Sequence, residues 1–160
     1  MSTASFIGVV INPQDKGTTI EPNQKLFGKE IEIKHDNPVF HSTVIDESTD
    51  IIRIYHHFDG QPNRLGNTLL NEFDTYEKAI NLMSFGDASS INGELAIFYN
   101  TWRNTDEWDY TKPKQFKNEE LFESNSAESY IYLFKDGRWL VKQCYSCNPE
   151  WKELSEVVKK

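Results

Sequence analysis

The chain has 160 residues, and its 17 Lys and Arg residues against 25 Asp and Glu residues give a net charge of −8. This length is typical of one domain, so we expect a single domain over residues 1–160. Ten Phe, seven Tyr and four Trp supply enough apolar surface for a core, which excludes disorder of the whole chain. The negative charge disfavours long nucleic acids as partners. Because no apolar run reaches the roughly 20 residues of a membrane span, we expect no membrane partner and a cytoplasmic protein.

Strands dominate the first part of the chain. The apolar run at residues 6–11 predicts a buried strand, and the period-2 alternation at 31–33 predicts a half-exposed one. A further short strand is expected at 39–45. The clearest strand covers residues 51–58 and ends at the turn Asp59-Gly60, where we expect the glycine to adopt a positive φ.

Adjacent side chains of the strand at 51–58 point to opposite faces of a sheet. One face therefore carries Ile52, Ile54 and His56. The opposite face carries Ile51, Arg53, Tyr55 and His57. Because of this arrangement, we do not expect the two adjacent histidines to bind the same metal ion.

Two helices are predicted after the turn. Pro62 suits a first helical turn, and the spacing of the following leucines predicts a helix over 62–73. A second helix over 74–86 begins with Asp74 as its N-cap and ends at Gly86. The next elements are a polar turn at 87–90 and a strand at 95–102.

The last third of the chain contains a strong hairpin signal. Strands at 130–134 and 138–144 are joined by Asp136-Gly137, which favours a type I′ turn. A short helix is expected near 116–122, and Asn148-Pro149 is typical of the start of a C-terminal helix. We therefore predict an α+β fold, in which a twisted antiparallel sheet carries an inserted helical pair and a C-terminal helix.

The two cysteines, Cys144 and Cys147, form a C-x-x-C motif. Such a motif is half of a zinc site, and in redox proteins it lies at the start of a helix. No second half lies at metal-ligand spacing in the sequence, and the predicted helix begins after Cys147. We therefore expect structural thiols, with zinc and redox roles as the alternatives, and we predict neither a metal nor a cofactor.

His57 and Asp59 form the first candidate site. A histidine and a carboxylate two residues apart on one strand face can bind a metal ion or transfer protons. The alternative is that Asp59 organises the turn while one histidine packs in the core. A metal-dependent hydrolase that uses His57 and Asp59 is thus one functional hypothesis.

The stretch that follows the strand at 95–102 combines aromatic and acidic residues. If the aromatic side chains are exposed, they form a contact patch of the kind enriched at protein interfaces, and if they are buried they belong to the core. Over 106–128 seven acids face three lysines, which favours a basic protein partner. The candidate binding residues of this stretch are Trp102, Arg103, Trp108, Asp109 and Tyr110.

A second hypothesis is a protein that sequesters a nucleotide messenger. Bases stack on aromatic rings, and Arg53, Arg64 or Arg103 would supply a small basic pocket. A cyclic or other small nucleotide suits an acidic protein better than a long nucleic acid does. The sequence contains no P-loop and no Rossmann fingerprint, so this hypothesis rests on side-chain types alone.

Three segments carry a recognisable pattern, namely His-Phe-Asp-Gly-Gln-Pro at 57–62, Gly-Asn-Thr-Leu-Leu at 66–70 and Gly-Asp-Ala-Ser-Ser-Ile at 86–91. The pattern resembles the signature of a family of small uncharacterised proteins common in bacteriophages and bacterial mobile elements. Their usual signature is His-Trp-Asp-Gly-Tyr-Pro, then Gly-x-x-Leu-Leu, then Gly-Asp-x-Ser-Ser-Leu, so Phe58 and Gln61 depart from it. The resemblance covers about half of the chain and implies a phage-type origin, without an activity or catalytic residues.

These observations favour a non-enzymatic accessory protein that binds and inhibits a host protein, with an immune component as the leading candidate. The partner is expected to present a basic surface, and a homo-oligomer is left open. A phage-encoded chain would act in the cytoplasm of the host cell. Beside the five residues of the acidic aromatic stretch, the expected binding residues are His57, Asp59 and Arg64.

Overall fold

The structure is a computed structural model that describes residues 3–22, 25–26, 29–30, 41–92, 95–102 and 108–158. At 25–26, 29–30 and 102 it describes the backbone alone. The strand predicted at 31–33 lies outside the described residues. The mixture of helices and strands confirms the predicted α+β fold.

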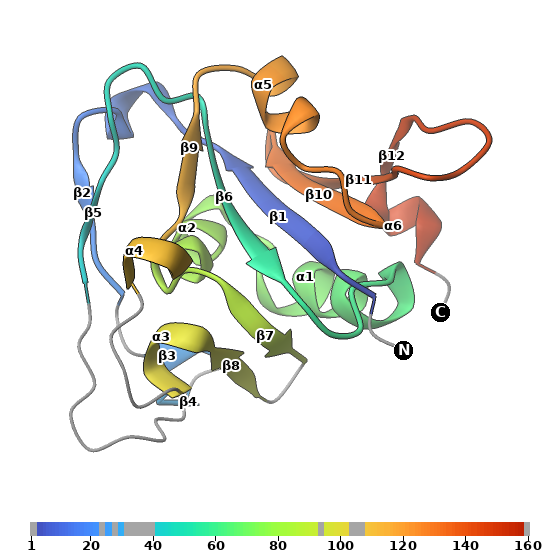
Figure 1. The fold of residues 1–160 in the computed structure, drawn as a ribbon, viewed down its shortest axis with the longest axis horizontal. Helices are drawn as coiled ribbons and strands as arrows, with labels where there is room; N and C mark the ends of the chain where they lie inside the picture. The colour runs from blue at the N-terminus through green and yellow to red at the C-terminus, as the bar shows by residue number, and fades with distance from the viewer. Residues whose placement is uncertain are drawn as a thin grey trace.

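One large sheet forms the centre of the molecule (Figure 1). Its strands, in spatial order, are β12 (Trp151–Glu153), β11 (Arg138–Gln143), β10 (Tyr130–Lys135), β1 (Ser5–Val10), β6 (Ile51–His56), β7 (Ala88–Ile91) and β8 (Ala96–Phe98), and β9 (Lys114–Phe116) pairs with β6. Two small sheets pair β2 (Thr19–Ile20) with β5 (Thr43–Val44), and β3 (Lys25–Leu26) with β4 (Lys29–Glu30). Of the strand predicted at 39–45, residues 39 and 40 lie outside the described residues, and Thr43–Val44 is the strand found within 41–45.

The main sheet is mixed, which corrects the prediction of a purely antiparallel sheet. β1 lies parallel to β10, and β6 is parallel to β7 at His56 and Ala88, whereas the other neighbours are antiparallel. The chain returns from β6 to β7 through the predicted helical pair, and such a helical crossover joins parallel strands. The strand at β7 was missed because Ala-Ser-Ser carries little strand propensity, and it replaces the polar turn expected at 87–90.

The helices lie on both sides of the sheet. α1 and α2 lie behind the sheet in Figure 1, whereas α5 lies at the upper end of the side that faces the viewer. Their bounds are Asn67–Glu72 for α1, Tyr76–Ser84 for α2, Tyr99–Trp102 for α3, Trp108–Thr111 for α4, Glu119–Ser124 for α5 and Leu154–Val157 for α6. A π-helical turn at Pro62–Gly66 leads into α1, and a 3-10 turn covers Pro13–Asp15. Within the described residues, no helix is long and apolar enough to cross a membrane.

The main core lies between the sheet and the helices α1, α2 and α6. Apolar side chains of alternate strand residues meet those of the helices there, which is the period-2 and period-3.6 pattern expected from the sequence. Trp139 donates its indole N–H to the carbonyl of Phe73 and so joins β11 to the end of α1. Fully buried members include Ile7, Val9, Ile52, Ile54, Leu65, Leu69, Leu82 and Tyr132.

A smaller core lies on the opposite face of the sheet, under α5. Ile51, Phe122 and Leu133 are buried together there. A Cβ atom on Gly8 of β1 would come within 2.8 Å of the Phe122 ring, so glycine lets α5 pack closely onto the strand. This core covers only the upper part of the face, and the lower part remains open.

The turn after β6 differs from its prediction. Asp59, not Gly60, has the positive φ, at 56°. Gly60 is needed for space, because a Cβ atom there would lie 2.6 Å from the Thr3 carbonyl oxygen and from the Ser5 hydroxyl. The Gly60 carbonyl accepts a hydrogen bond from the buried Tyr132 hydroxyl, at 2.6 Å. The Gly60 N–H donates to the Thr3 carbonyl, at 2.8 Å, so the turn is bound to the segment before β1 and to β10.

Three predicted elements begin or end elsewhere. The strand expected at 95–102 is short, and its second half forms α3. The helix expected from Pro149 is preceded by β12, which pairs with β11, so the C-terminal helix is the four-residue α6. Thr75, not Asp74, caps α2 by accepting a hydrogen bond from the Lys78 N–H, at 3.2 Å. In each case a tertiary contact or a better-placed side chain outweighs local propensity.

Candidate functional site

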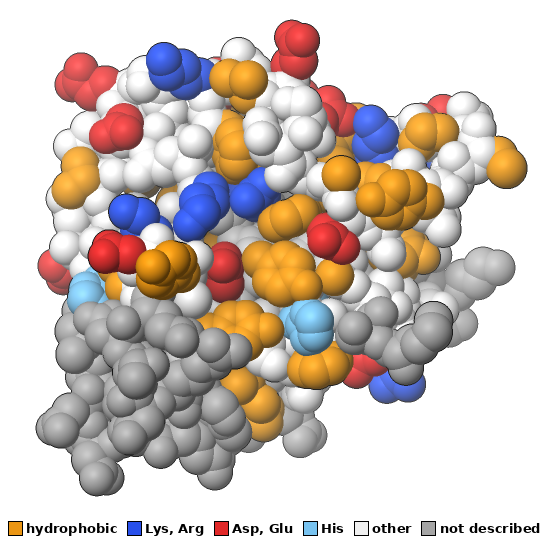
Figure 2. All heavy atoms as spheres, viewed as in Figure 1, with side chains coloured by type: hydrophobic (Ala, Val, Ile, Leu, Met, Phe, Trp, Pro, Cys, Tyr) orange, Lys and Arg blue, Asp and Glu red, His pale blue; other side chains and the backbone are white. Residues whose placement is uncertain are grey.

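The lower part of the sheet face opposite α1 and α2 carries a group of aromatic and charged side chains, which we call the open face. Figure 2 shows hydrophobic, basic and acidic side chains together near the centre of this side of the molecule. Its members come from β1, β6, β9 and the turn after β6. They are Phe6, Arg53, Tyr55, His57, Phe58 and Lys114.

Arg53 is the most firmly held cation of the open face. Its guanidinium carbon lies 4.0 Å from the centre of the Phe6 ring and 4.9 Å from that of Phe116, so the group lies between two aromatic rings. It also donates to the Asn125 carbonyl, at 2.6 Å, and to the Ser126 hydroxyl, at 3.1 Å. Burial lowers the pKa of Arg53 to about 10, and the guanidinium stays charged at neutral pH.

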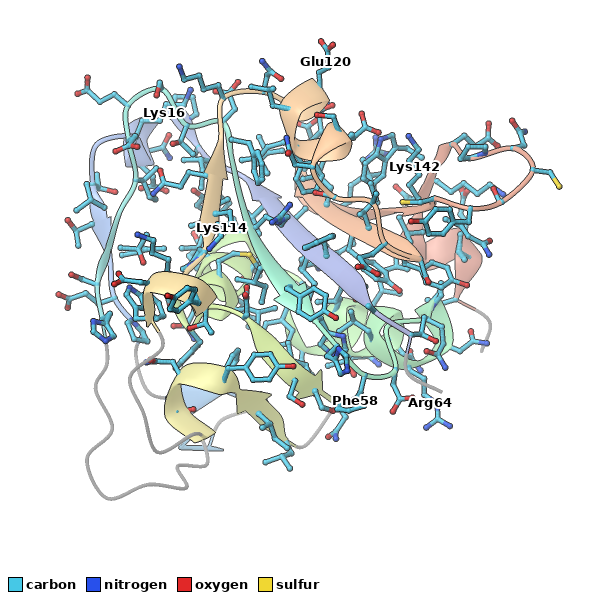
Figure 3. All side chains as sticks on the ribbon, in the orientation of Figure 1. Lys16, Phe58, Arg64, Lys114, Glu120 and Lys142 are labelled. Atoms are coloured by element: carbon cyan, nitrogen blue, oxygen red, sulfur yellow. The ribbon has the colours of Figure 1, made fainter. Side chains whose placement is uncertain are left out.

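Lys114 lies directly opposite Arg53 across the β6–β9 pair. Side chains of directly opposed residues share a sheet face and lie close together, so like charges there repel each other. Within the described residues, neither cation has a carboxylate at ion-pair distance, whereas Lys16, Lys135 and Lys142 each have one. The position of Lys114 is labelled in Figure 3, where it projects over β9 and β6.

The Asp87 carboxylate interacts electrostatically with both cations. β6 changes neighbours along one edge, from β9 to β7, and the Asp87 carboxylate accepts the hydrogen bond of the Tyr55 N–H at the change, at 2.9 Å. Burial raises the pKa of Asp87 to about 6, although the Tyr55 N–H, Lys114 and Arg53 all favour the ionised form. The fold therefore holds a partly buried carboxylate at a cost in stability.

The aromatic part of the open face begins at Tyr55. Its hydroxyl lies 2.7 Å from Nδ1 of His57, and the His57 ring meets Phe58 edge to face with 4.4 Å between ring centres. Burial raises the pKa of the Tyr55 hydroxyl, so the group stays protonated at neutral pH and is poorly suited to act as a nucleophile. Phe58 ends the run with 45 % of its surface exposed.

The histidine next in sequence belongs to the covered face. His56 is fully buried, accepts a hydrogen bond from the Ile91 N–H at 3.0 Å and lies 3.4 Å from the Ser5 hydroxyl. Burial, together with the nearby His57, lowers the pKa of His56 to about 3. The two histidines thus lie on opposite faces, as the strand period predicts.

The structure separates His57 from Asp59. His57 contacts Tyr55 on the open face, whereas Asp59 and Arg64 line a cavity of about 360 Å³ together with three asparagines of the π-helical turn and α1. Figure 3 labels Phe58, just after the end of β6, and Arg64, on the π-helical turn, at separate positions. Within the described part of the chain, no group of three or more His, Cys, Asp or Glu side chains is placed to hold a metal ion.

The acidic aromatic stretch is divided in its exposure. Tyr110 is 83 % exposed and Asp109 is exposed, but Trp108 is half-buried and stacks on His41 with 5.0 Å between ring centres. The side chain of Trp102 and the whole of Arg103 lie outside the described residues. Among the described side chains of this stretch, Tyr110 is therefore the large aromatic one that is exposed.

Part of the acidity between 106 and 128 is neutralised within the chain. Glu119 pairs with Lys135 at 2.6 Å, and Glu123 pairs with Lys142 at 2.8 Å and accepts the indole N–H of Trp151. These carboxylates attach α5 to the sheet. They are therefore less available to a basic partner than the charge count of the sequence indicates.

Comparison with known proteins adds no relative. No family model matches this chain, and no curated protein and no solved structure matches it. The resemblance to the phage family therefore stays a prediction.

Cys144 and Cys147 are both free thiols, and burial raises the pKa of Cys144, which makes it less reactive at neutral pH.

Sequence reasoning missed the role of Asp87 and Lys114. Both lie far from Arg53 in the sequence, and their proximity depends on β6 pairing with β7 and β9. The alternation over 51–58 did place Arg53, Tyr55 and His57 on one face. What the sequence lacked was a signal that this face is left uncovered.

Proposed function

We propose that this chain is a non-enzymatic, phage-type accessory protein that binds and inhibits a host protein through its open face. The observation that carries the proposal is the run Tyr55, His57 and Phe58, which continues from the sheet onto the exposed turn. Aromatic residues and arginine are enriched in the central contacts of protein interfaces, where they provide large rigid contact areas. The resemblance to phage proteins supports a partner from the host.

The charge distribution supports a contact that combines long-range charge attraction with apolar packing. The net charge of −8 attracts a basic partner at long range, which raises the association rate and makes that rate sensitive to salt. The centre of the open face carries Arg53 and Lys114 against the single carboxylate of Asp87, so it has a small positive charge within an acidic molecule. The proposed partner therefore approaches by its basic surface and contacts the aromatic run mainly through apolar side chains.

The test begins with co-purification from cells of the host, followed by reconstitution of the purified pair. Calorimetry then compares the wild type with Phe58→Ser, for which we expect binding to weaken at least about tenfold, and with Tyr145→Ser as the matched control. Tyr145 is 72 % exposed on the loop between β11 and β12, away from the open face. Equal effects of the two substitutions, or turnover of a small molecule in place of a partner, contradict the proposal.

A further inference from the structure

The strongest unexplained feature of the open face is its pair of opposed cations. Arg53 and Lys114 are directly paired across β6 and β9, and no carboxylate of the described residues is in ion-pair contact with either. An acidic chain with 25 carboxylates had many ways to neutralise them. A fold that retains an unfavourable pair of like charges commonly does so because the pair binds a ligand.

The pair is arranged to hold an anion in place. The two rings of Phe6 and Phe116 and the acceptors Asn125 and Ser126 fix the guanidinium of Arg53. Lys114 has weaker contacts, since its ammonium group lies 3.4 Å from the carbonyl oxygens of Tyr110 and Lys112. One cation is thus rigid and the other is able to move towards a ligand.

Charge limits the size of the ligand. With Asp87 ionised, Arg53 and Lys114 leave a net charge of 2 − 1 = +1 at this point. One phosphate monoester, which carries a charge of about −1.5 to −2 near neutral pH, comes close to balancing that charge, whereas several phosphates do not. A long nucleic acid would bring many phosphates against a molecule of net charge −8.

An aromatic surface lies beside the cations at a fixed spacing. Tyr55 follows Arg53 by two residues on the same face of β6, a step of roughly 6.6 Å along a strand. His57 and Phe58 extend this surface towards solvent. A ring stacked on Tyr55 and joined to a phosphate by a short linker would place the phosphate beside Arg53 and Lys114.

We propose that the open face binds a mononucleotide, with its phosphate between Arg53 and Lys114 and its base stacked on the ring of Tyr55, beside His57 and Phe58. Stacking on such rings tolerates every base, so the phosphate contact sets the class of ligand and the base identity matters less. This inference goes beyond the proposed partner and does not depend on it.

The test measures binding of adenosine monophosphate, adenosine and ribose 5-phosphate to the purified full chain by calorimetry and by amide chemical shifts. We expect the mononucleotide to bind at least about tenfold more tightly than either fragment, because each fragment loses one of the two contacts. Equal binding of adenosine overturns the phosphate contact. Equal binding of ribose 5-phosphate overturns the contact with the base and leaves a site for an adventitious ion only. An absence of binding by all three compounds overturns the whole inference.

Variants test the location of the site. Lys114→Gln should weaken mononucleotide binding about tenfold, whereas Lys78→Gln on α2, an exposed lysine on the covered side, should leave it unchanged. Equal loss in both variants, or no loss in Lys114→Gln, contradicts the site. Lys114→Gln tests nucleotide binding, and Phe58→Ser tests binding of the protein partner. If Phe58→Ser loses the partner and the wild type binds no nucleotide, the proposed function alone is supported. Nucleotide binding that depends on Lys114, without any partner, supports this inference alone.

Discussion

The two faces of strand β6 place neighbouring histidines in different environments. His56 lies in the main core with both ring nitrogens in contact with the protein, and it is neutral at physiological pH. His57 lies on the open face against Tyr55 and Phe58. The covered face combines polar groups with partners and apolar neighbours, whereas the open face carries aromatic and charged groups that are only partly buried. This difference assigns stability to the covered face, and it is the reason why we propose binding for the open face.

The largest expected effect on stability comes from replacing the two histidines. His56→Ala leaves a cavity and an unpaired Ile91 N–H, so we expect it to lower the free energy of unfolding by about 3 kcal/mol. His57→Ala removes a half-buried side chain and should cost less than about 1 kcal/mol. Urea denaturation of both variants checks the pair, and similar losses from the two would contradict the assignment of the faces.

Asp87 provides the next test, because its carboxylate lies beside the open face at a cost in stability. Asp87→Asn keeps an acceptor for the Tyr55 N–H without burying a charge. We expect this variant to be more stable than the wild type by about 2 kcal/mol at pH 7.5, since burial raises the pKa of the carboxyl group to about 6. A destabilised variant at that pH would show that the negative charge itself supports the fold.

The pH dependence of stability separates the two groups. Folded Asp87 binds its proton more tightly than unfolded Asp, so its contribution falls as the pH rises from about 4 to about 6. Folded His56 binds its proton less tightly than unfolded His, so its contribution is lost as the pH falls from about 6.5 towards about 3. The two slopes oppose each other in the wild type. Unfolding curves of Asp87→Asn between pH 4 and 7 should therefore show a steeper loss in acid than those of the wild type.

A smaller effect is expected at the opposed cations. Lys114→Met removes one of two like charges and should raise the free energy of unfolding by about 0.5 kcal/mol while it removes one of the two proposed phosphate contacts. Thermal melts beside ligand titrations measure both quantities. A variant that loses stability and binding together would indicate that Lys114 has a structural role.

The smallest effect concerns the acidic side chains of α5. Glu119→Gln removes an exposed pair with Lys135 and should change stability by less than about 0.5 kcal/mol, and by less still at high salt. Denaturation at two salt concentrations checks this. A larger loss would mean that α5 depends on its ion pairs more than on the burial of Phe122.

Local pattern was enough to predict much of the covered face. The alternation over 51–58, the periodicity of α2 and the Asp136-Gly137 turn all depend on residues close in sequence, and the positive φ of both turn residues confirms the turn. The parallel pairing of β1 with β10 joins segments more than 100 residues apart, and no local signal encodes it. The same holds for the meeting of Arg53, Lys114 and Asp87. The open face is therefore the part of the molecule that required the tertiary structure.

The most direct test of the central claim is a crosslinking measurement on the reconstituted pair. A photoreactive benzoylphenylalanine is placed at position 58 in one sample and at position 145 in the other, because both side chains are exposed and they lie on different parts of the molecule. If the open face is the binding surface, the probe at 58 attaches to the partner and the probe at 145 does not. Attachment from 145 without attachment from 58 would contradict the account.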